Sequence, residues 1–203
     1  MPTNEHYFTE EPTSPSEPHE LVVQVRKRTL TLTSDRGVFS HAEADKGTLL
    51  LAARVQFGEA RRILDLGCGY GLLGIVAGLE CPDARVTFVD TNQRAVSLAK
   101  LNAEHLGLRS AEFLTCDAPA VLGDRMFDLV MCNPPYAAGK RVFMPMLTDA
   151  AARLSPGGGL WIVGRTKQGI KTLARDVSEL FATVETVDIK GGYRVIRLVK
   201  APE

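Results

Sequence analysis

A repeated order of strand, turn and helix, which begins after Arg62, is the feature that most constrains how this chain can fold. Short runs of β-branched and aliphatic residues predict strands, and the longer amphipathic segments between them predict helices. The expected strands span residues 63–66, 86–89, 112–115, 127–132 and 160–163, and the expected helices span residues 72–79, 92–105, 142–154 and 170–181. Because strands that alternate with helices form a mostly parallel sheet, we expect helices on both of its faces.

Each end of the chain predicts a hairpin, one turning at Lys27-Arg28 and the other at Gly191-Gly192. Asp45 is placed to cap a helix that follows the first hairpin. The predicted fold class is therefore α/β: a Rossmann-like, doubly wound, seven-stranded and mostly parallel sheet with an antiparallel C-terminal hairpin, plus a small N-terminal β-hairpin extension. The segments that form the two hairpins are residues 21–26 with 29–33, and residues 182–189 with 193–199.

The length of 203 residues suits one domain that needs no disulfide or metal to fold. Residues 1–20 contain five glutamates, four prolines and no Lys or Arg, which is typical of an acidic, extended lead-in. We predict a single domain over residues 21–203, with a β-hairpin and loop extension at 21–45 and the Rossmann-like core at 46–203. No segment predicts a secretion signal or a membrane span, so we expect a cytoplasmic protein without a membrane partner.

The cysteines favour the same compartment. Cys68, Cys81, Cys116 and Cys132 form no C-x-x-C pair, and no histidine cluster lies near them in the sequence. Most of them adjoin apolar, strand-like runs, where a reduced cysteine behaves as a small hydrophobic residue. We therefore expect four buried thiols and no metal site.

Polar and glycine residues follow successive strands, and open α/β sheets bind ligands at the carboxyl ends of their strands. The first strand runs into Asp65–Gly71, where glycines let a ligand approach main-chain N–H groups. Asp90 ends the second strand and is placed to accept both hydroxyls of a ribose. Asp117 and the backbone N–H of Ala118, after the third, suit the edge of an adenine. Each acid alone is also an ordinary helix cap, but the three together indicate an adenosine-type ligand.

The fourth strand ends in Asn133-Pro134-Pro135-Tyr136. The two prolines hold the backbone extended, so the Asn133 side-chain oxygen and the Pro134 carbonyl can be directed at one point. Two acceptors at one point suit a planar NH₂ group, which has two hydrogens to donate. Tyr136 offers an aromatic face on which a ring can stack.

These segments resemble the ordered motifs of class I S-adenosylmethionine-dependent methyltransferases, and Asn133–Tyr136 is similar to that of enzymes that methylate exocyclic or amide nitrogens. Tyr7-Phe8, Gly37–Ser40 and Asp45–Leu50 further resemble the methyltransferase-small domain family, which includes ribosomal RNA small subunit methyltransferase C. The likeness covers about residues 6–165. Only about 60 residues precede the first core strand, so the chain resembles the single-domain members and not those with a second, degenerate copy of the domain.

The resemblance implies S-adenosyl-L-methionine as the cofactor and no metal. The methionine end of the cofactor would lie on Asp65 and the glycine loop, its ribose on Asp90 and its adenine on Asp117. The implied cofactor-binding residues are Asp65, Gly67, Cys68, Gly69, Gly71, Asp90, Thr91, Asp117, Ala118 and Asn133. The implied catalytic residues are Asn133, Pro134 and Tyr136, and the implied substrate-binding residues are Pro135, Tyr136 and Lys140.

The function that this resemblance implies is direct methyl transfer to the exocyclic N2 amine of a guanine in ribosomal RNA, with free rRNA or a ribosomal subunit as the partner. Adenine N6 and protein glutamine N5 are the alternatives, although the glutamine enzymes usually add a helical N-terminal domain where residues 21–33 predict strands. A nicotinamide-dependent oxidoreductase would explain why Gly69–Gly74 fits G-x-G-x-x-G. It would leave Asn133–Tyr136 without a use and place Asp65 against a pyrophosphate. An inactive binding protein would leave the intact Asn133 and Asp65 unexplained.

The formal net charge of zero argues against strong, indiscriminate affinity for RNA. Residues 1–20 carry a charge of −5, however, and residues 21–36 and 164–203 each carry +3. The lead-in thus masks a modestly basic body, which is compatible with recognition of a shaped RNA through a few local charges. The candidate phosphate contacts are Arg26-Lys27-Arg28, Lys140-Arg141, Arg165, Lys167 and Lys171.

Overall fold

The structure is a computed structural model that describes residues 14–115 and 119–203, so Tyr7-Phe8 and the expected site residues Asp117 and Ala118 lie outside the described residues. The strands are β1 (His19–Val25), β2 (Arg28–Ser34), β3 (Arg62–Leu66), β4 (Arg85–Asp90), β5 (Ala111–Thr115), β6 (Phe127–Cys132), β7 (Leu154–Arg165), β8 (Thr183–Lys190) and β9 (Tyr193–Val199). The helices are α1 (Lys46–Arg54), α2 (Leu72–Glu80), α3 (Gln93–His105), α4 (Pro119–Leu122), α5 (Lys140–Ala152) and α6 (Ile170–Asp176). Short 3₁₀ turns are η1 (Tyr136–Ala138), η2 (Thr166–Gln168) and η3 (Ser178–Leu180).

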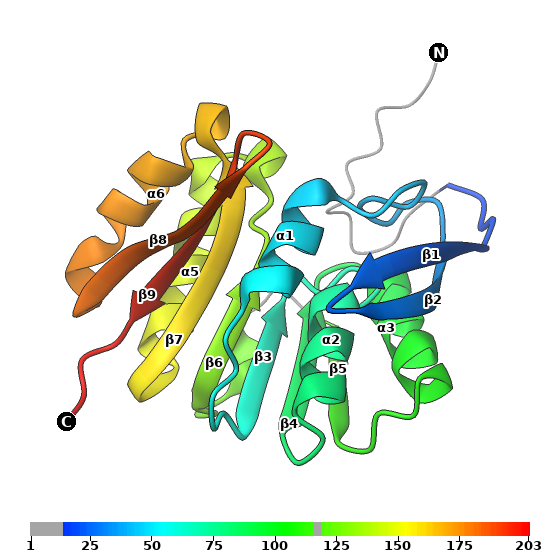
Figure 1. Cartoon of the computed structure of the whole chain (residues 1–203), viewed down its shortest axis with the longest axis horizontal. Coiled ribbons are helices and arrows are strands. Elements are labelled where there is room, and N and C mark those ends of the chain that lie inside the picture. The colour runs from blue at the N-terminus through cyan, green and yellow to red at the C-terminus, as the bar shows by residue number, and fades with distance from the viewer. Residues whose placement is uncertain (1–13, 116–118) are drawn as a thin grey trace.

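Seven strands form the main sheet in the order β5-β4-β3-β6-β7-β9-β8 (Figure 1). β3, β4, β5, β6 and β7 pair in parallel, and β9 pairs antiparallel with both β7 and β8. The chain turns from β8 into β9 through Gly191-Gly192, where both glycines have a positive φ. These pairings confirm the predicted seven-stranded, mostly parallel sheet with an antiparallel C-terminal hairpin.

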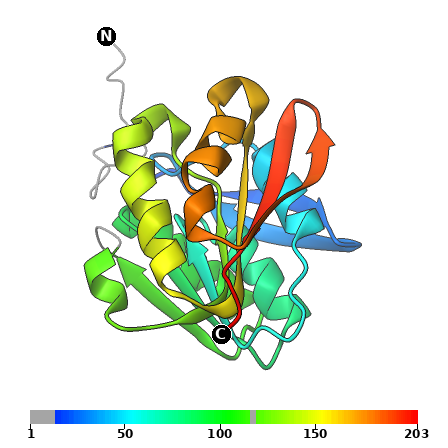
Figure 2. The same cartoon turned by 90° about the vertical axis from the view of Figure 1, so that its left-hand side faces the viewer.

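Helices cover both faces of the sheet, as its alternation of strands and helices predicts. α1, α2 and α3 share one hydrophobic core with the N-terminal hairpin, and α5 and α6 share the other with the opposite face of the sheet. Figure 2 shows α5 and α6 side by side in front of the strands. Within residues 14–115 and 119–203, no helix combines the length and apolar character that a membrane span requires.

The central strand β3 contributes side chains to both hydrophobic cores. All of its residues from Ile63 to Leu66 are buried, and Ile63 packs in one core while Leu64 packs in the other. A strand that is buried on both faces reads as a continuous apolar run, which is why residues 63–66 predict a strand without alternation. Its neighbours β4 and β6 lie on opposite sides, so their connections leave the carboxyl end of β3 open.

The N-terminal hairpin turns one residue earlier than predicted. Val25 pairs with Arg28, so the turn residues are Arg26 and Lys27 and not Lys27-Arg28. Both turn residues have a positive φ, 48° and 61°, which side-chain-bearing residues seldom adopt. The Arg26 guanidinium donates to the backbone oxygens of Ala52 and Val55 at the end of α1. These tertiary contacts fix the register of the hairpin, and the sequence contains no local turn motif that would predict it.

β1 also begins at His19, inside the segment predicted as an acidic lead-in. Ser16 and the Glu17 backbone donate to the Asp35 carboxylate, both at 2.6 Å. The described part of this segment is therefore packed against the domain from Ser14 onward, and its last residues belong to the hairpin.

Two elements near the C-terminus differ from their predicted lengths. β7 is 12 residues long because the backbone of Gly157 and Gly158 bonds to Ala201 and Lys200, which draws the glycine run into the sheet. The helix predicted over 170–181 ends at Asp176. The Ser178 hydroxyl donates to the Arg175 carbonyl at 2.7 Å, and such local side-chain bonds compete with helix continuation.

We predict that Gly74→Ala destabilises the fold. A Cβ at Gly74 would overlap the Phe88 ring, and that ring cannot yield because it stacks on Phe113 at a centroid distance of 4.8 Å. Overpacking of this kind lowers the free energy of unfolding by about 1–3 kcal/mol, which chemical denaturation would measure.

The Phe88→Leu exchange supplies the control, because it makes room for the added methyl group. The double variant should lose less stability than the sum of the two single variants. A neutral or stabilising effect of Gly74→Ala alone would contradict this packing explanation.

Candidate active site

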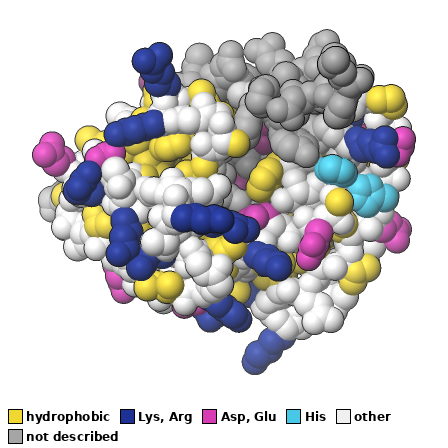
Figure 3. Space-filling view, turned by 90° about the horizontal axis from the view of Figure 1, so that it is seen from above, with side chains coloured by type: hydrophobic (Ala, Val, Ile, Leu, Met, Phe, Trp, Pro, Cys, Tyr) yellow, Lys and Arg dark blue, Asp and Glu magenta, His cyan; other side chains and the backbone are white. Residues whose placement is uncertain are grey.

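A cavity of about 850 Å³ opens at the carboxyl edge of the parallel strands. The loops that follow β3, β4, β6 and β7 line it, and residues 38–48 close it from the side of the N-terminal hairpin. Figure 3 views the molecule from this edge, with Lys and Arg side chains spread over the side that carries α6, β8 and β9. The site therefore lies where the strand order predicts a ligand.

The loop after β3 is built from glycines that the backbone geometry requires. Gly67, Gly69 and Gly71 have φ values of 72°, 54° and 94°, in the left-handed region that favours glycine. The loop is held by the Gly67 and Cys68 N–H groups, which both donate to the Val89 carbonyl, at 2.8 and 2.9 Å. A Cβ at Gly69 would meet nothing within 4 Å, so the backbone there is open to an approaching ligand.

Asp65 lies behind this loop and is fully buried. Its Oδ2 accepts from the Gly74 N–H at 2.7 Å, whereas its Oδ1 has no hydrogen-bond partner among the described residues. Burial, and to a smaller extent the nearby Asp90 carboxylate, raise the pKa of Asp65 to about 7. Because an unpaired buried acceptor is costly, the site favours a ligand that brings a hydrogen-bond donor or a positive charge.

Asp90 lines the cavity and ties the second strand to the glycine loop. Its Oδ2 accepts from the Gly69 N–H and its Oδ1 from the Asn92 N–H, both at 2.9 Å. Burial raises the pKa of Asp90 despite these bonds, which lower it. A carboxylate oxygen has more than one lone pair, so each can still accept from a ligand hydroxyl.

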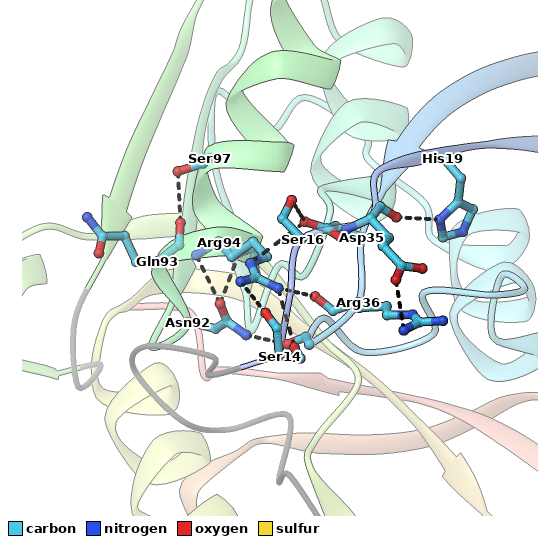
Figure 4. Close-up of polar contacts among 12 residues, drawn as sticks. Ser14, Ser16, His19, Asp35, Arg36, Asn92, Gln93, Arg94 and Ser97 are labelled. Atoms are coloured by element: carbon cyan, nitrogen blue, oxygen red, sulfur yellow. Dashed lines mark hydrogen bonds and ion pairs between the residues drawn. The ribbon is translucent and has the colours of Figure 1, made fainter.

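A polar network fixes the wall of the cavity at residues 36–40 (Figure 4). The Asn92 amide donates to the Gly37 carbonyl at 2.7 Å, and Arg94 donates to the Arg36 carbonyl at 2.6 Å. Arg94 also pairs with the buried Asp35 at 3.7 Å. The start of α3 therefore holds the segment that carries Val38, Phe39 and Ser40 against the cavity.

The segment after β6 forms the opposite wall. Asn133, Pro134, Pro135 and Tyr136 all line the cavity. The Tyr136 hydroxyl donates to the Val163 carbonyl at 3.2 Å, and its ring lies at 5.4 Å from that of Phe143. Burial raises the pKa of Tyr136 well above its usual range, so the phenol stays protonated and acts as a fixed aromatic surface.

The chain brings two further groups to Asn133 that the motif alone does not predict. The Asn133 amide nitrogen donates to Thr48 Oγ1 at 2.9 Å and to Asp45 Oδ2 at 3.1 Å. Asp45 is the N-cap of α1, as predicted, and it also accepts from the Tyr193 hydroxyl at 3.3 Å. Residues 45–50 carry a recognisable motif, but nothing in the sequence marks Tyr193, which arrives from β9.

The structure assembles most of the predicted site residues. The predicted residues that line the cavity are Gly67, Cys68, Gly69, Asp90, Thr91, Asn133, Pro134, Pro135 and Tyr136. Asp65 and Gly71 lie just outside this lining, Asp65 buried beneath the loop. Lys140 does not line the cavity: its ammonium donates to Asp176 at 2.6 Å, because α5 begins there and directs the side chain toward α6.

The cysteines that the structure describes offer no nucleophile at this site. Cys68 and Cys132 are buried, and burial raises the pKa of both thiols well above the usual range. Cys81 is half-exposed at the end of α2, which corrects the prediction for that residue, and Cys116 lies outside the described residues. Within the described ranges, no group of His, Cys, Asp and Glu side chains could hold a metal ion.

The residues present fit S-adenosyl-L-methionine. Its cationic methionine end would lie on the open glycine loop, beneath which the unpaired carboxylate oxygen of Asp65 is buried. Its ribose would meet Asp90, whose carboxylate lies on the cavity wall. Those two carboxylates suit a cation and a diol, and a pyrophosphate would be repelled by both.

Both the sequence and the fold are similar to those of known methyltransferases. The model of the methyltransferase small domain family matches residues 29–197. Uncharacterized protein YbxB of Bacillus subtilis is 36% identical over 199 residues, which cover 97% of this chain and 99% of that protein. Ribosomal RNA large subunit methyltransferase G of Stutzerimonas stutzeri is 34% identical over 194 residues, or 93% of this chain and 51% of that protein.

Among solved structures, the T. thermophilus 16S rRNA N2 G1207 methyltransferase RsmC, in complex with AdoMet and guanosine, superimposes with a TM-score of 0.79 at 27% identity. The match covers 93% of this chain and 52% of that one. The chain thus spans about half the length of these rRNA methyltransferases.

We predict that the affinity for S-adenosylmethionine rises with pH until about pH 7. Below that pH Asp65 is protonated in the unliganded protein, and a bound cation favours its ionised form, so binding releases a proton. Calorimetric titration over a pH series would show the affinity increasing by at most ~tenfold per pH unit and then levelling off.

Asp65→Asn is the matched control, because it keeps the shape of the side chain and removes its titration. Its affinity should be weaker at neutral pH, and its pH dependence should be smaller than that of the wild type. Identical profiles for the two proteins would show that Asp65 does not interact with the cofactor.

Proposed function

The chain belongs to the methyltransferase small domain family, and on that premise we propose that it transfers the methyl group of S-adenosylmethionine to the exocyclic N2 amine of a guanine in ribosomal RNA. The observation that carries the proposal is that one cavity joins the glycine loop and Asp90 to Asn133–Tyr136. A shared cavity supports this proposal, because direct transfer requires the cofactor and the substrate amine to be held side by side.

S-adenosylmethionine supplies an electrophilic methyl group when it is bound. The backbone of the glycine loop and Asp90 hold and orient that cofactor. The Asn133 oxygen and the Pro134 carbonyl accept the two hydrogens of the substrate amine, which favours a pyramidal nitrogen whose lone pair faces the methyl group. Tyr136 supports the ring of the base. No covalent nucleophile is needed, and the proton leaves to water after transfer.

Guanine N2 is the preferred acceptor because RsmC, a similar structure, is an N2 G1207 methyltransferase bound to guanosine. Adenine N6 remains the nearest alternative, since its amine is also planar. Glutamine N5 of a protein is less favoured, because residues 19–34 form strands and not a helical N-terminal unit. A cytoplasmic location is part of this proposal, because the proposed substrate is ribosomal RNA.

Local cations at the mouth of the cavity support an RNA substrate. Arg165 and Lys167, from the end of β7 and η2, line it. The predicted cluster at Arg26–Arg28 has a different use, because Arg26 and Arg28 both pair with Glu80 and brace the hairpin. We therefore assign phosphate contacts to the side that carries β7 and α6.

We predict that Asn133→Ala abolishes methyl transfer, because the Asn133 oxygen contacts the substrate amine. The cofactor should still bind, because the glycine loop and Asp90 hold it. Single-turnover transfer and calorimetric titration would measure the two properties separately. Asp90→Ala is the counterpart and should weaken cofactor binding. Retained turnover in Asn133→Ala would remove that residue from the catalytic role.

We predict that labelled methyl groups appear in ribosomal RNA as N2-methylguanosine. The assay would offer free rRNA, each ribosomal subunit and ribosomal protein, all from cells that lack the enzyme, and would digest the product to nucleosides. N6-methyladenosine or methylated glutamine would support one of the two alternatives instead. Binding to RNA that does not weaken with added salt would exclude the phosphate contacts.

A further inference from the structure

Both hydrogens of the Asn133 side-chain amide are used inside the protein. They point to Thr48 Oγ1 at 2.9 Å and to Asp45 Oδ2 at 3.1 Å. An asparagine amide has two N–H donors and one oxygen acceptor, so the oxygen is what remains for the cavity. The proposed chemistry needs that acceptor and not a donor at this place.

We propose that Asp45 is a positioning residue for methyl transfer: its carboxylate fixes the Asn133 amide with the oxygen toward the substrate amine. The proposal rests on the proposed function and deepens it. A carboxylate accepts hydrogen bonds and cannot donate them, so it excludes the flipped amide, whose oxygen would face the Asp45 charge. The Thr48 hydroxyl donates its one hydrogen to Asp45 Oδ2 at 3.2 Å, so it accepts from the Asn133 amide, and Asp45 sets its orientation too.

Asp45 can set this orientation because its own position is fixed from several sides. Its Oδ2 caps α1 by accepting the Thr48 N–H at 2.8 Å. Its Oδ1 accepts from the Tyr193 hydroxyl, which in turn accepts from Arg165 Nε at 3.0 Å. The Arg165 guanidinium also lies 4.7 Å from the centre of the Tyr193 ring.

Gly47 makes this arrangement sterically possible. A Cβ at that position would lie 2.7 Å from the Tyr193 ring, which packs directly over the first turn of α1. The first turn of α1 and the C-terminal strand β9 are therefore fitted to each other at the point where Asp45 is held. The carboxylate also polarises the Asn133 amide, which strengthens its oxygen as an acceptor.

The test separates positioning from helix capping with Asp45→Ser. Serine is a good N-cap, so α1 keeps its cap, but the side chain is shorter and uncharged and cannot replace the carboxylate at Asn133. We expect the turnover number to fall at least ~tenfold, while the melting temperature, the cofactor affinity and the KM for RNA change little.

Asp149→Ser is the matched control. It makes the same substitution on α5, where Asp149 pairs with Arg153 away from the cavity, and it should leave turnover unchanged. Wild-type turnover in Asp45→Ser would overturn the proposal. So would a loss of cofactor affinity and melting temperature in proportion to the loss of turnover.

A second readout does not depend on any substrate. In the ¹⁵N-labelled, unliganded protein, the Asn133 side-chain amide, identified by its absence in Asn133→Ala, should give two hydrogen-bonded proton signals. At least one should move toward the free-amide position in Asp45→Ser. Free-amide signals in the wild type would overturn the proposed orientation. Methyl transfer to no RNA, with the shifted amide signals present, would instead overturn the proposed function and leave the orientation standing.

Discussion

The rest of the structure depends on the strand order around β3, where the chain adds strands first on one side of β3 and then on the other. β4 lies on one side of this strand and β6 on the other. α2, which joins β3 to β4, and α5, which follows β6, lie on opposite faces of the sheet, so the edge above β3 stays uncovered. The glycine loop turns there because its residues tolerate positive φ, and Asp90 and Asn133 reach the same edge from the neighbouring strands. The cavity is thus a consequence of strand order first and of side-chain choice second.

Strands and site residues that follow local rules could be predicted from the sequence. Ile63–Leu66 and Phe127–Cys132 are apolar runs that end in glycine or proline, so both the strands and the position of the ligand edge follow from the residues themselves. The pairing of Asn133 with Asp45 could not be predicted in this way, because 88 residues separate them and each has a complete local role. Asp45 is a sufficient helix cap, and Asn133 is a sufficient strand terminator.

Two of the errors in prediction have the same origin. Contacts between Arg26 and the end of α1 fix the turn at Arg26-Lys27. Lys140 does not reach the cavity because it pairs with Asp176, which lies 36 residues away on α6. In each case a long, flexible cationic side chain binds a group that is close in the folded structure but distant in the sequence. Charge clusters in a sequence therefore say little about which cations remain for a ligand until the ion pairs of the fold are known.

The network of Asn92, Arg94 and Asp35 holds the segment that follows the N-terminal hairpin in place as part of the cavity wall. The Rossmann-like core at 46–203 holds the strands of the main sheet, the glycine loop and Asn133, yet it lacks Val38, Phe39, Ser40 and Asp45. A transplant of that core into another protein would carry an incomplete binding site. The functional unit is larger than the folding motif, and its boundary lies at the hairpin.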